Sequence, residues 1–205
     1  MSYFPFFVDL EGKGGLIVGG GNVAARKVEK LLPYGPSLTV VAPEIGAEIE
    51  AQPVTLLRRP FEERDLEDMS FVIAAATPTV NHRVAALCNA RGLPVNVVDD
   101  RDYCSFLFPA LVKRGSLSVG ISTSGASPTA AIYLKNQISA LLPENFEELL
   151  DFLESLRPVL KAEIPVERQR SKVYTALFSA CMGAGRPLTD AEVRAMMEEA
   201  KEAHL

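Results

Sequence analysis

The sequence predicts an α/β protein in which an N-terminal parallel sheet is covered by helices and a smaller helical domain follows. Two observations support this fold class. Between Gly15 and about Asp100, short apolar runs rich in β-branched residues alternate with longer stretches of helical periodicity, as in a parallel sheet with crossover helices. Beyond Pro143, apolar residues recur at helical spacing with acidic residues on the opposite face.

The apolar runs are the predicted strands of the sheet. They are Leu16–Val18, Leu38–Ala42, Thr55–Leu57, Phe71–Ala75 and Val95–Val98. Helical segments are expected near residues 22–33, 44–51, 62–67 and 80–91. This order predicts a Rossmann-like, doubly wound sheet, and such sheets bind ligands at the carboxyl ends of their strands.

A different pattern follows the predicted sheet. A further strand is expected over Leu117–Ser122. After a polar turn, a helix is expected from Pro128 to about Leu141, with Ser127 as its N-cap.

The C-terminal third is predicted to be helical. Its apolar side chains share one helical face, and they are Phe146, Leu149, Leu150, Leu153 and Leu156. Thr189 and Glu192 form a capping box before a last helix that is expected to run to the terminus.

Composition excludes several classes of protein. The 205 residues, with 48% hydrophobic and 23% charged residues, are typical of a soluble globular protein. A formal charge of −5 argues against nucleic-acid binding, which needs a surplus of Lys and Arg. No leader pattern and no apolar run of membrane-spanning length is present, so no membrane partner is expected. Cys88, Cys104 and Cys181 lack metal or redox spacing, which favours reduced thiols and a cytoplasmic location.

The glycine-rich turn after the first strand predicts a dinucleotide site. Gly19 permits the tight turn, Gly21 lets the backbone approach a pyrophosphate, and Ala24 permits close packing of the helix on the strand. The amides at the start of the helix then face the phosphates. The alternative is a tight strand-to-helix turn without a ligand.

An acidic residue near the end of the second strand is the other part of this signature, because it binds the adenosine ribose. Glu44 is the nearest carboxylate, and its charge favours NAD over NADP by repelling a 2′-phosphate. The alternative, which the sequence leaves open, is that Glu44 lies in the first turn of the next helix, where negative charge is favoured anyway.

Asp99 is the candidate general base. It follows the strand Val95–Val98, at the sheet edge where ligand sites form. A turn-forming Asp99-Asp100 pair explains the same spacing. Cys104 is either a neighbour of this cleft or a small buried residue.

Several other polar residues have two readings. The hydroxyls and amides of the Ser122–Pro128 turn, including Ser124, either hold an anionic group or only cap a helix. With only His82 and His204 present, no histidine metal site is expected, and His82 is interpreted as a surface helix residue. The cluster Arg168, Arg170 and Lys172 is either a solvated face or a site for a polycarboxylate.

Together these motifs resemble the precorrin-2 dehydrogenase family, the N-terminal module of siroheme synthases. The likeness covers nearly the whole chain. The segments that carry it are Phe4-Pro5-Phe6 with Leu10, Gly19 to Lys27, Val40 to Glu44, Asn96 to Asp100, Cys104-Ser105-Phe106 with Pro109, and Ser122 to Pro128. The resemblance implies oxidation of precorrin-2 to sirohydrochlorin with NAD as hydride acceptor, in some members joined to Fe²⁺ insertion by ferrochelatase activity.

The resemblance also assigns cofactor contacts. Asn22 and Val23 match positions at the pyrophosphate, and Pro43 and Glu44 match positions at the adenosine end. Asp99 matches the family's essential aspartate.

The resemblance implies the domain organisation as well. It gives an NAD-binding domain over residues 1–112, a dimerisation segment over 113–143, hence a homodimer, and a helical domain over 144–205. Thr123, with Ser122 and Ser124 beside it, is expected to line the tetrapyrrole cleft. The chain departs from the family at Ser124, where glycine is common, and at Ile132, where arginine is common. The methyltransferase domain fused to some relatives is expected to be absent.

Two other functions stay open at this stage. An NAD(H)-sensing regulatory module would share the glycine turn without catalysis, since the fold alone does not fix function. A dehydrogenase for a small hydroxy or amino acid would need a His or Lys base at the nicotinamide, and the sequence offers no convincing one.

Overall fold

The computed structural model describes residues 3–202, which form two compact units. The first unit comprises residues 1–108 and 124–126, and the second comprises residues 109–123 and 127–205, within the described range. His204 lies outside the described residues. Within residues 3–202, no helix has both the length and the apolar character that crossing a bilayer requires.

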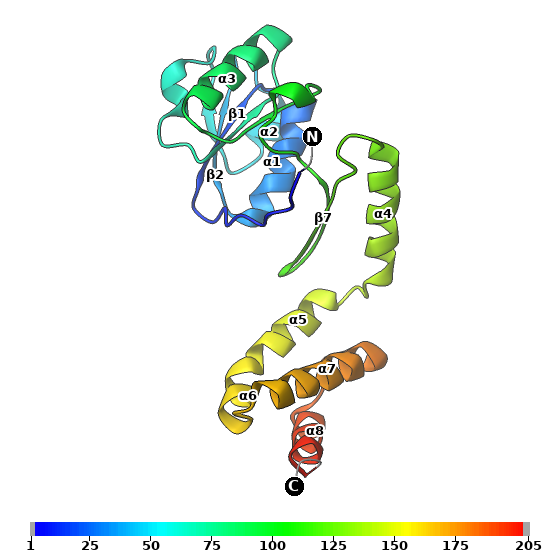
Figure 1. The fold of residues 1–205 in the computed structure, drawn as a ribbon. Coiled ribbons are helices and arrows are strands. Elements are labelled where there is room, and N and C mark those ends of the chain that lie inside the picture. Colours follow the sequence, from blue (N-terminus) through cyan, green and yellow to red (C-terminus); the bar gives the residue numbers. More distant parts are fainter. Residues whose placement is uncertain (1–2, 203–205) are drawn as a thin grey trace. The chain divides into compact units, whose positions relative to one another are not determined.

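The first unit is built on a five-stranded parallel sheet with the order β3-β2-β1-β4-β5 (Figure 1). The strands are β1 (Gly14–Val18), β2 (Ser37–Val41), β3 (Thr55–Leu57), β4 (Phe71–Ala74) and β5 (Val95–Val97). Strand β1 lies at the centre and pairs with β2 on one side and β4 on the other. The predicted parallel sheet is confirmed, and the reversal of strand order at β1 marks the edge where ligands bind in such folds.

Helices cover both faces of this sheet because neighbouring residues on a strand point to opposite sides. Ile17 packs with Ala24 and Val28 on one face, whereas Leu16 and Val18 belong to the core on the other face. The α-helices of this unit are α1 (Asn22–Leu31), α2 (Ala47–Glu50) and α3 (Pro78–Ala90). The 3₁₀ helices of this unit are η1 (Leu32–Tyr34), η2 (Glu63–Leu66) and η3 (Arg101–Tyr103).

Two predicted helices of this unit are shorter than expected. The helix expected near 44–51 is reduced to α2, which begins at Ala47, because its N-cap Gly46 has extended backbone and residues 43 and 44 form a bend. The helix expected near 62–67 is the 3₁₀ helix η2. Its N-cap Glu62 and Asp65 form a capping box, which closes the single turn.

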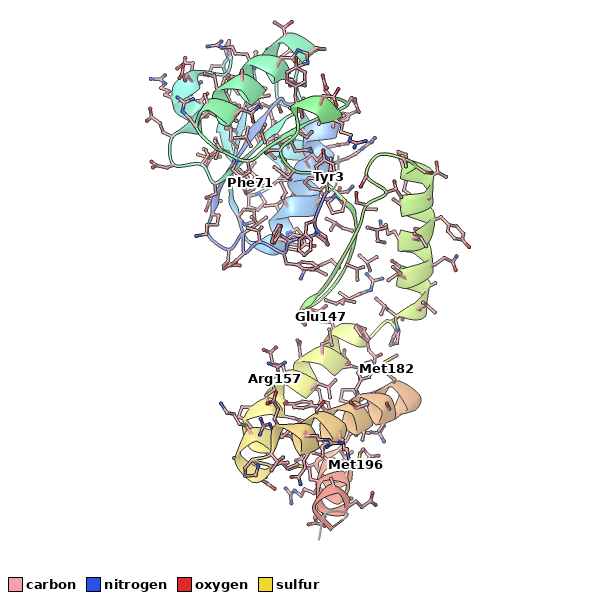
Figure 2. The ribbon with its side chains drawn as sticks, viewed as in Figure 1. Tyr3, Phe71, Glu147, Arg157, Met182 and Met196 are labelled. Carbon is pink, nitrogen blue, oxygen red and sulfur yellow. The ribbon has the colours of Figure 1, made fainter. Side chains whose placement is uncertain are left out.

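The second unit begins with an antiparallel hairpin that the sequence analysis predicted only in part. Strand β7 (Leu117–Ile121) was expected, but its partner β6 (Ala110–Arg114) was not, and the pair forms a sheet of its own. The turn between them needs Gly115, whose φ is +50° and whose α-carbon faces Glu147, labelled in Figure 2. This hairpin puts the division between units at Phe108 and Pro109, because the expected boundary at residue 112 would cut strand β6.

Helices form the rest of the second unit. They are α4 (Pro128–Leu141), α5 (Phe146–Ser155), α6 (Arg157–Glu163), α7 (Glu167–Ala184) and α8 (Asp190–Glu202). Ser127 caps α4 as predicted, since its Oγ accepts a hydrogen bond of 3.1 Å from the amide of Ala130. The predicted capping box is confirmed: Glu192 accepts from the Thr189 amide at 2.7 Å, and Thr189 Oγ1 accepts from the Glu192 amide at 3.3 Å.

One core unites α5 to α8. Its fully buried centre includes Leu149, Leu160, Leu177 and Cys181, with Met196 of α8, labelled in Figure 2, packed against it. Helix α4 instead packs on the hairpin. A domain boundary was expected at residue 143. The residues on both sides of this position belong to the second compact unit.

Candidate dinucleotide-binding site

The glycine turn between β1 and α1 is held by steric contacts at two of its three glycines. Gly19 has a φ of +127°, and a Cβ there would lie 2.2 Å from the carbonyl oxygen of Ala75. A Cβ on Gly20 would lie 2.0 Å from the carbonyl oxygen of Glu44. Both neighbours are backbone atoms and have little freedom to move, so these positions require glycine.

Gly21 differs from its two neighbours because the space around it is open. No atom lies within 4 Å of the position that its Cβ would take. Gly21 is also the N-cap of α1, and no side chain caps the amides of the first turn. Asn22 and Val23 of this turn are exposed. The open space and uncapped amides fit an anionic group such as the pyrophosphate of a dinucleotide.

The loop after β2 lies beside the glycine turn. The amide of Gly46 donates a hydrogen bond of 2.9 Å to the carbonyl oxygen of Gly20, which fastens the two loops together. Glu44 is exposed in this loop, before α2 begins at Ala47. The structure therefore removes the alternative that Glu44 lies within the first turn of the helix, and its ribose-binding role stays a prediction.

A cleft of about 270 Å³ adjoins these loops. Its walls are largely apolar and come from the ends of β1, β2 and β4, from the loop after β3 and from α3. The lining residues are Val18, Gly19, Val41, Ala42, Pro43, Pro60, Phe61, Ala76, Thr77, Val80 and Arg83. The volume and lining suit the adenosine part of a dinucleotide. Predicted residues Gly19 and Pro43 thus share one cleft.

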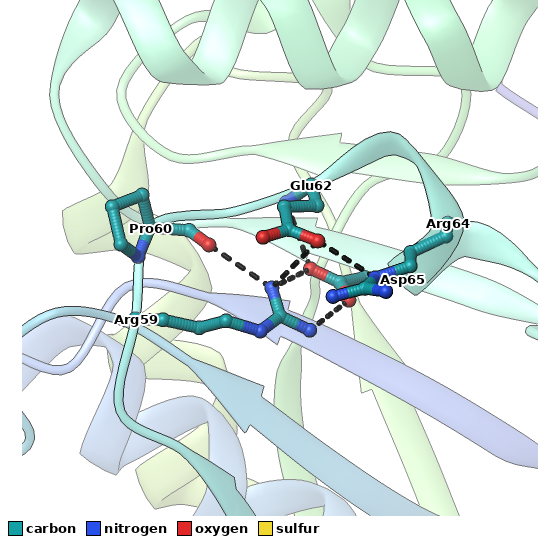
Figure 3. A network of polar contacts seen from close by, with 5 residues as sticks. All are labelled: Arg59, Pro60, Glu62, Arg64 and Asp65. Atoms are coloured by element: carbon teal, nitrogen blue, oxygen red, sulfur yellow. Dashed lines mark hydrogen bonds and ion pairs between the residues drawn. The ribbon is translucent and has the colours of Figure 1, made fainter.

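Two polar networks fix the walls of this cleft, and the sequence analysis identified neither. Buried Asn81 accepts a hydrogen bond of 2.9 Å from the Ala76 amide and donates one of 3.3 Å to the Ala76 carbonyl. On the opposite wall, Arg59 binds both carboxylate oxygens of Asp65 and the carbonyl of Pro60 (Figure 3). The hydrogen bond from Arg59 lowers the pKa of Asp65.

Asp99 lies at the same edge of the sheet, two residues beyond the end of β5. Its side chain is exposed and its φ is +60°, in the left-handed region that only a few per cent of non-glycine residues adopt. Such a conformation persists where the surroundings hold it.

The segment after Asp99 is anchored along β5 by side chains. Cys104 Sγ accepts a hydrogen bond of 3.1 Å from the Val97 amide, and its thiol donates toward the carbonyls of Val97 and Asp100 at 3.2 and 3.3 Å. Ser105 Oγ accepts from the Val95 amide at 2.8 Å. Burial raises the pKa of the Cys104 thiol, so it stays protonated and able to donate. Cys104 is thus a structural, half-buried residue.

A second anchor holds the turn from the side of α3. His82 Nε2 lies 2.8 Å from Asp100 Oδ2, and the imidazole stacks on the ring of Tyr103 with centroids 4.1 Å apart. His82 lies on a surface helix as expected, but it has a partner that the sequence did not indicate. Asp99 is therefore held in place between the Cys104 and Asp100 anchors.

Lys27 is the site residue that the sequence analysis missed. It lies on α1, and its Nζ is 3.9 Å from the centroid of the Phe108 ring. Burial lowers its pKa from 10.5 to about 8, with Lys30 lowering it further and Cys104 and Asp99 raising it. A signal was present: Lys27 follows buried Ala24 by three residues and precedes buried Leu31 by four, so it borders the buried face of the helix.

The second polar turn supplies backbone geometry more than free groups. Thr123 Oγ1 donates to the Ser127 carbonyl and accepts from the Ser127 amide, both at 3.0 Å, within the second unit. Ser124 and Gly125, which belong to the first unit, have φ values of +53° and +83°. A Cβ on Gly125 would lie 3.1 Å from Arg101 Nη1. The roles of Ser122, Thr123 and Ser124 in substrate binding stay predictions.

The basic cluster of the second unit is in part structural. Arg170 donates to the carbonyls of Ile164 and Pro165 at 2.8 and 2.7 Å, which satisfies the end of α6. Arg168 and Lys172 line a surface hollow with Val166 and Gln169. In the part of the chain described, no three His, Cys, Asp or Glu side chains gather as a metal site requires.

The fold and the cleft define a dinucleotide-binding α/β protein. Comparison with family models agrees, because residues 6–110 match the family described as "Putative NAD(P)-binding". The chain belongs to this family. The NAD-type cofactor predicted from the glycine turn is thereby confirmed.

Comparison with curated proteins finds siroheme synthases. The chain is 35% identical over 189 residues to that of Neisseria meningitidis serogroup C (strain 053442), which covers 90% of this chain and 39% of the relative. It is 36% identical over 184 residues to that of Photorhabdus laumondii, which covers 87% of this chain and 39% of the relative. The chain thus spans about two fifths of the length of the curated relatives it matches.

Among solved structures, the chain resembles one described as SirC, precorrin-2 dehydrogenase. The TM-score is 0.78 at 26% sequence identity, and the match covers 98% of this chain and 100% of that one. These similarities confirm the resemblance on which the sequence-based expectations were built.

Proposed function

We propose that this chain is an NAD-dependent dehydrogenase that oxidises precorrin-2 to sirohydrochlorin in siroheme biosynthesis. The observation that carries the proposal is an exposed aspartate, Asp99, held in a left-handed turn at the sheet edge that also carries the dinucleotide cleft. Similarity to SirC over nearly the whole chain supports the choice of substrate.

The reaction removes a hydride and a proton from the substrate. The oxidised nicotinamide of NAD⁺ supplies the hydride acceptor and becomes NADH. In the proposal, Asp99 accepts the proton and passes it to solvent, to which it is exposed. The remaining residues hold the two reactants in place, which supplies much of the rate.

We propose NAD rather than NADP as the cofactor. Glu44 is exposed beside Pro43, which lines the cleft, and a carboxylate there repels a 2′-phosphate. In Glu44→Gln the ratio of the NADP and NAD dissociation constants is expected to fall by about tenfold. An unchanged ratio, measured by calorimetry, would remove Glu44 from the ribose site.

The activity test uses the purified chain, precorrin-2 and NAD⁺, with and without Fe²⁺, followed by absorbance. We expect NADH and sirohydrochlorin to form together. Asp99→Asn is expected to lower kcat by about a hundredfold or more with NADH affinity unchanged. Asp102→Asn, an exposed aspartate of the same segment, is the matched control.

Other results of this assay separate the alternatives. Tight NADH binding without turnover of precorrin-2 would identify an NAD-sensing module instead. Conversion of sirohydrochlorin to siroheme when Fe²⁺ is added would establish the ferrochelatase activity expected from some relatives.

We also propose that the chain acts as a cytoplasmic homodimer. The three cysteines are free, as suits a reducing compartment. Helix α4, within the expected dimerisation segment 113–143, exposes Ile132, Tyr133 and Leu134 by 55%, 62% and 46%. Ile132→Asp is expected to convert the dimer to a monomer in light scattering, because it places a charge on this apolar surface. A wild-type chain that is monomeric in light scattering would overturn the proposed homodimer.

A further inference from the structure

One charged residue lines the cleft beside the glycine turn. The walls of this cleft are largely apolar, and within residues 3–202 Arg83 is the only charged residue among them. Arg83 follows Val80 by three residues on α3, so the two side chains come from the same face of this helix. The cleft therefore combines an apolar lining with one planar cation.

The wall that carries Arg83 is fixed in place. Buried Asn81 binds both the amide and the carbonyl oxygen of Ala76, which joins the first turn of α3 to the end of the loop after β4. Ala76 lies against the glycine turn, since a Cβ on Gly19 would be 3.1 Å from the Ala76 amide nitrogen. The start of the helix that carries Arg83 is thus held beside this turn.

The guanidinium of Arg83 has an aromatic neighbour. Its central carbon lies over the Phe61 ring, 5.9 Å from the ring centroid. Phe61 is buried and belongs to the same core as Val84 of α3. Pro60, the residue before it, is held by Arg59 through its carbonyl oxygen (Figure 3). Because guanidinium groups stack on aromatic faces, Phe61 gives Arg83 a rigid support.

Arg83 differs from other arginines of the first unit in its partners. Each of four others pairs with a carboxylate, and these are Arg58, Arg59, Arg64 and Arg91. Within residues 3–202, by contrast, no carboxylate or carbonyl oxygen binds the exposed Arg83. Its guanidinium is therefore available to a ligand in the cleft.

A flat, neutral aromatic ring fits this combination of groups. Nucleobases stack both on apolar surfaces and on arginine guanidinium planes. NAD⁺ offers two ring systems, and its nicotinamide carries a positive charge, which the guanidinium of Arg83 repels. The adenine ring is neutral, so it is the part of the cofactor that this wall favours.

We propose that Arg83 is an adenine-binding residue, whose guanidinium, with the Phe61 ring on one face, stacks through its other face on the adenine base of the dinucleotide. The inference rests on the proposed function in one respect, because it takes the cleft as the adenosine site. It does not depend on which substrate is oxidised.

The first experiment measures the binding of adenosine and of ADP-ribose, which both lack nicotinamide, by NMR and calorimetry. Arg83→Ala is expected to weaken both by about tenfold, because it removes the stacking plane. Arg91→Ala removes the same charge at the other end of α3 and should bind both as wild type does. Adenosine has no phosphate, so a loss confined to ADP-ribose would show that Arg83 binds a phosphate and would overturn the inference.

The second experiment separates the plane of the guanidinium from its charge. Arg83→Lys keeps the positive charge and loses the planar group. We expect its affinity for adenosine to stay about fivefold below that of wild type. Full affinity in Arg83→Lys would show that charge alone is sufficient and would overturn the stacking.

The third experiment tests whether the effect is confined to the adenine half of the cofactor. Reduced nicotinamide mononucleotide has no adenine, so Arg83→Ala should bind it with unchanged affinity while its affinity for NADH falls by about tenfold. Fluorescence of the reduced nicotinamide reports both. Equal losses for the two ligands would indicate a general distortion of the site and would contradict the inference.

The inference and the proposed function fail separately. If the wild-type chain binds ADP-ribose but oxidises no precorrin-2, the proposed reaction is wrong, and the binding data still decide the role of Arg83. If precorrin-2 is oxidised and Arg83→Ala binds ADP-ribose as wild type does, the inference is wrong and the proposed function stands. A wild-type chain that binds neither adenosine nor ADP-ribose would overturn the inference, because the cleft would then not be an adenosine site.

Discussion

The two loops at the ligand-binding edge of the sheet are built in opposite ways. The glycine turn depends on side chains that are absent, because added atoms at Gly19 or Gly20 would meet backbone carbonyls. The Asp99 turn depends on side chains that are present, because Cys104 and the His82–Asp100 pair hold it in place. The first loop is therefore sensitive to atoms gained and the second to atoms lost.

The largest effect is expected where an atom is added against the backbone. Gly20→Ala puts a Cβ at 2.0 Å from the Glu44 carbonyl oxygen, which neither loop can avoid without moving. We expect the free energy of unfolding, measured in urea, to fall by about 2–4 kcal/mol. Gly183→Ala, in a helix and with nothing within 4 Å, is the control and should be neutral or stabilising. Equal stabilities of the two variants would contradict the steric account.

The second effect is expected where an atom is removed from the Asp99 turn. Cys104→Ala leaves the buried Val97 amide without its sulfur acceptor. We expect a loss of about 1–3 kcal/mol in unfolding free energy, because an unpaired buried donor retains its desolvation penalty. Cys104→Ser keeps an acceptor and should recover part of the loss. If the alanine variant matches wild type, the anchor is not needed for stability.

The third prediction sharpens the contrast within the glycine turn. Gly21→Ala adds a Cβ into open space, so the free energy of unfolding should change by less than about 1 kcal/mol. The same methyl group lies at the start of α1, where we propose that the pyrophosphate binds, so NADH affinity should fall by about tenfold. Fluorescence titration with NADH checks the affinity, and normal binding would place the pyrophosphate elsewhere.

The smallest effect concerns the charge of Lys27. Its pKa of about 8 when folded is below the ordinary 10.5, so between these values the unfolded chain binds more protons and stability rises with pH. Below pH 8 the charged, half-buried ammonium opposes folding. Lys27→Met should therefore gain stability relative to wild type at pH 7 and lose that advantage by about pH 10. An advantage that does not change with pH would show that packing, not charge, is responsible.

The contrast between the loops also explains what the sequence could predict. The positions of the five strands and of the glycine turn follow from local features, namely apolar runs and three glycines between a strand and a helix. A turn that depends on glycines can be recognised directly, because the glycines are consecutive in the sequence. Glu44 was located for the same reason, since it follows strand β2 within one loop.

The environment of Asp99 could not be predicted in this way. His82 and Cys104 come from different elements, and only the folded sheet brings α3 and the segment after β5 to one turn. Strand β6 was missed for a related reason. Its sequence, Ala110–Arg114, is short and ends in two basic residues, and only pairing with β7 makes it a strand.

The hydrogen bond from Gly46 to Gly20 has a consequence for redesign of cofactor preference. Because it ties the loop that carries Glu44 to the glycine turn, the loop cannot be replaced as an independent module. An exchange toward NADP would have to keep Gly20, Gly46 and the backbone path of residues 43–46, and vary only the exposed side chains along it. In the proposed function, preference for one nucleotide over the other is thus adjustable through the exposed side chains of this loop, while the course of its backbone is set by the turn beside it.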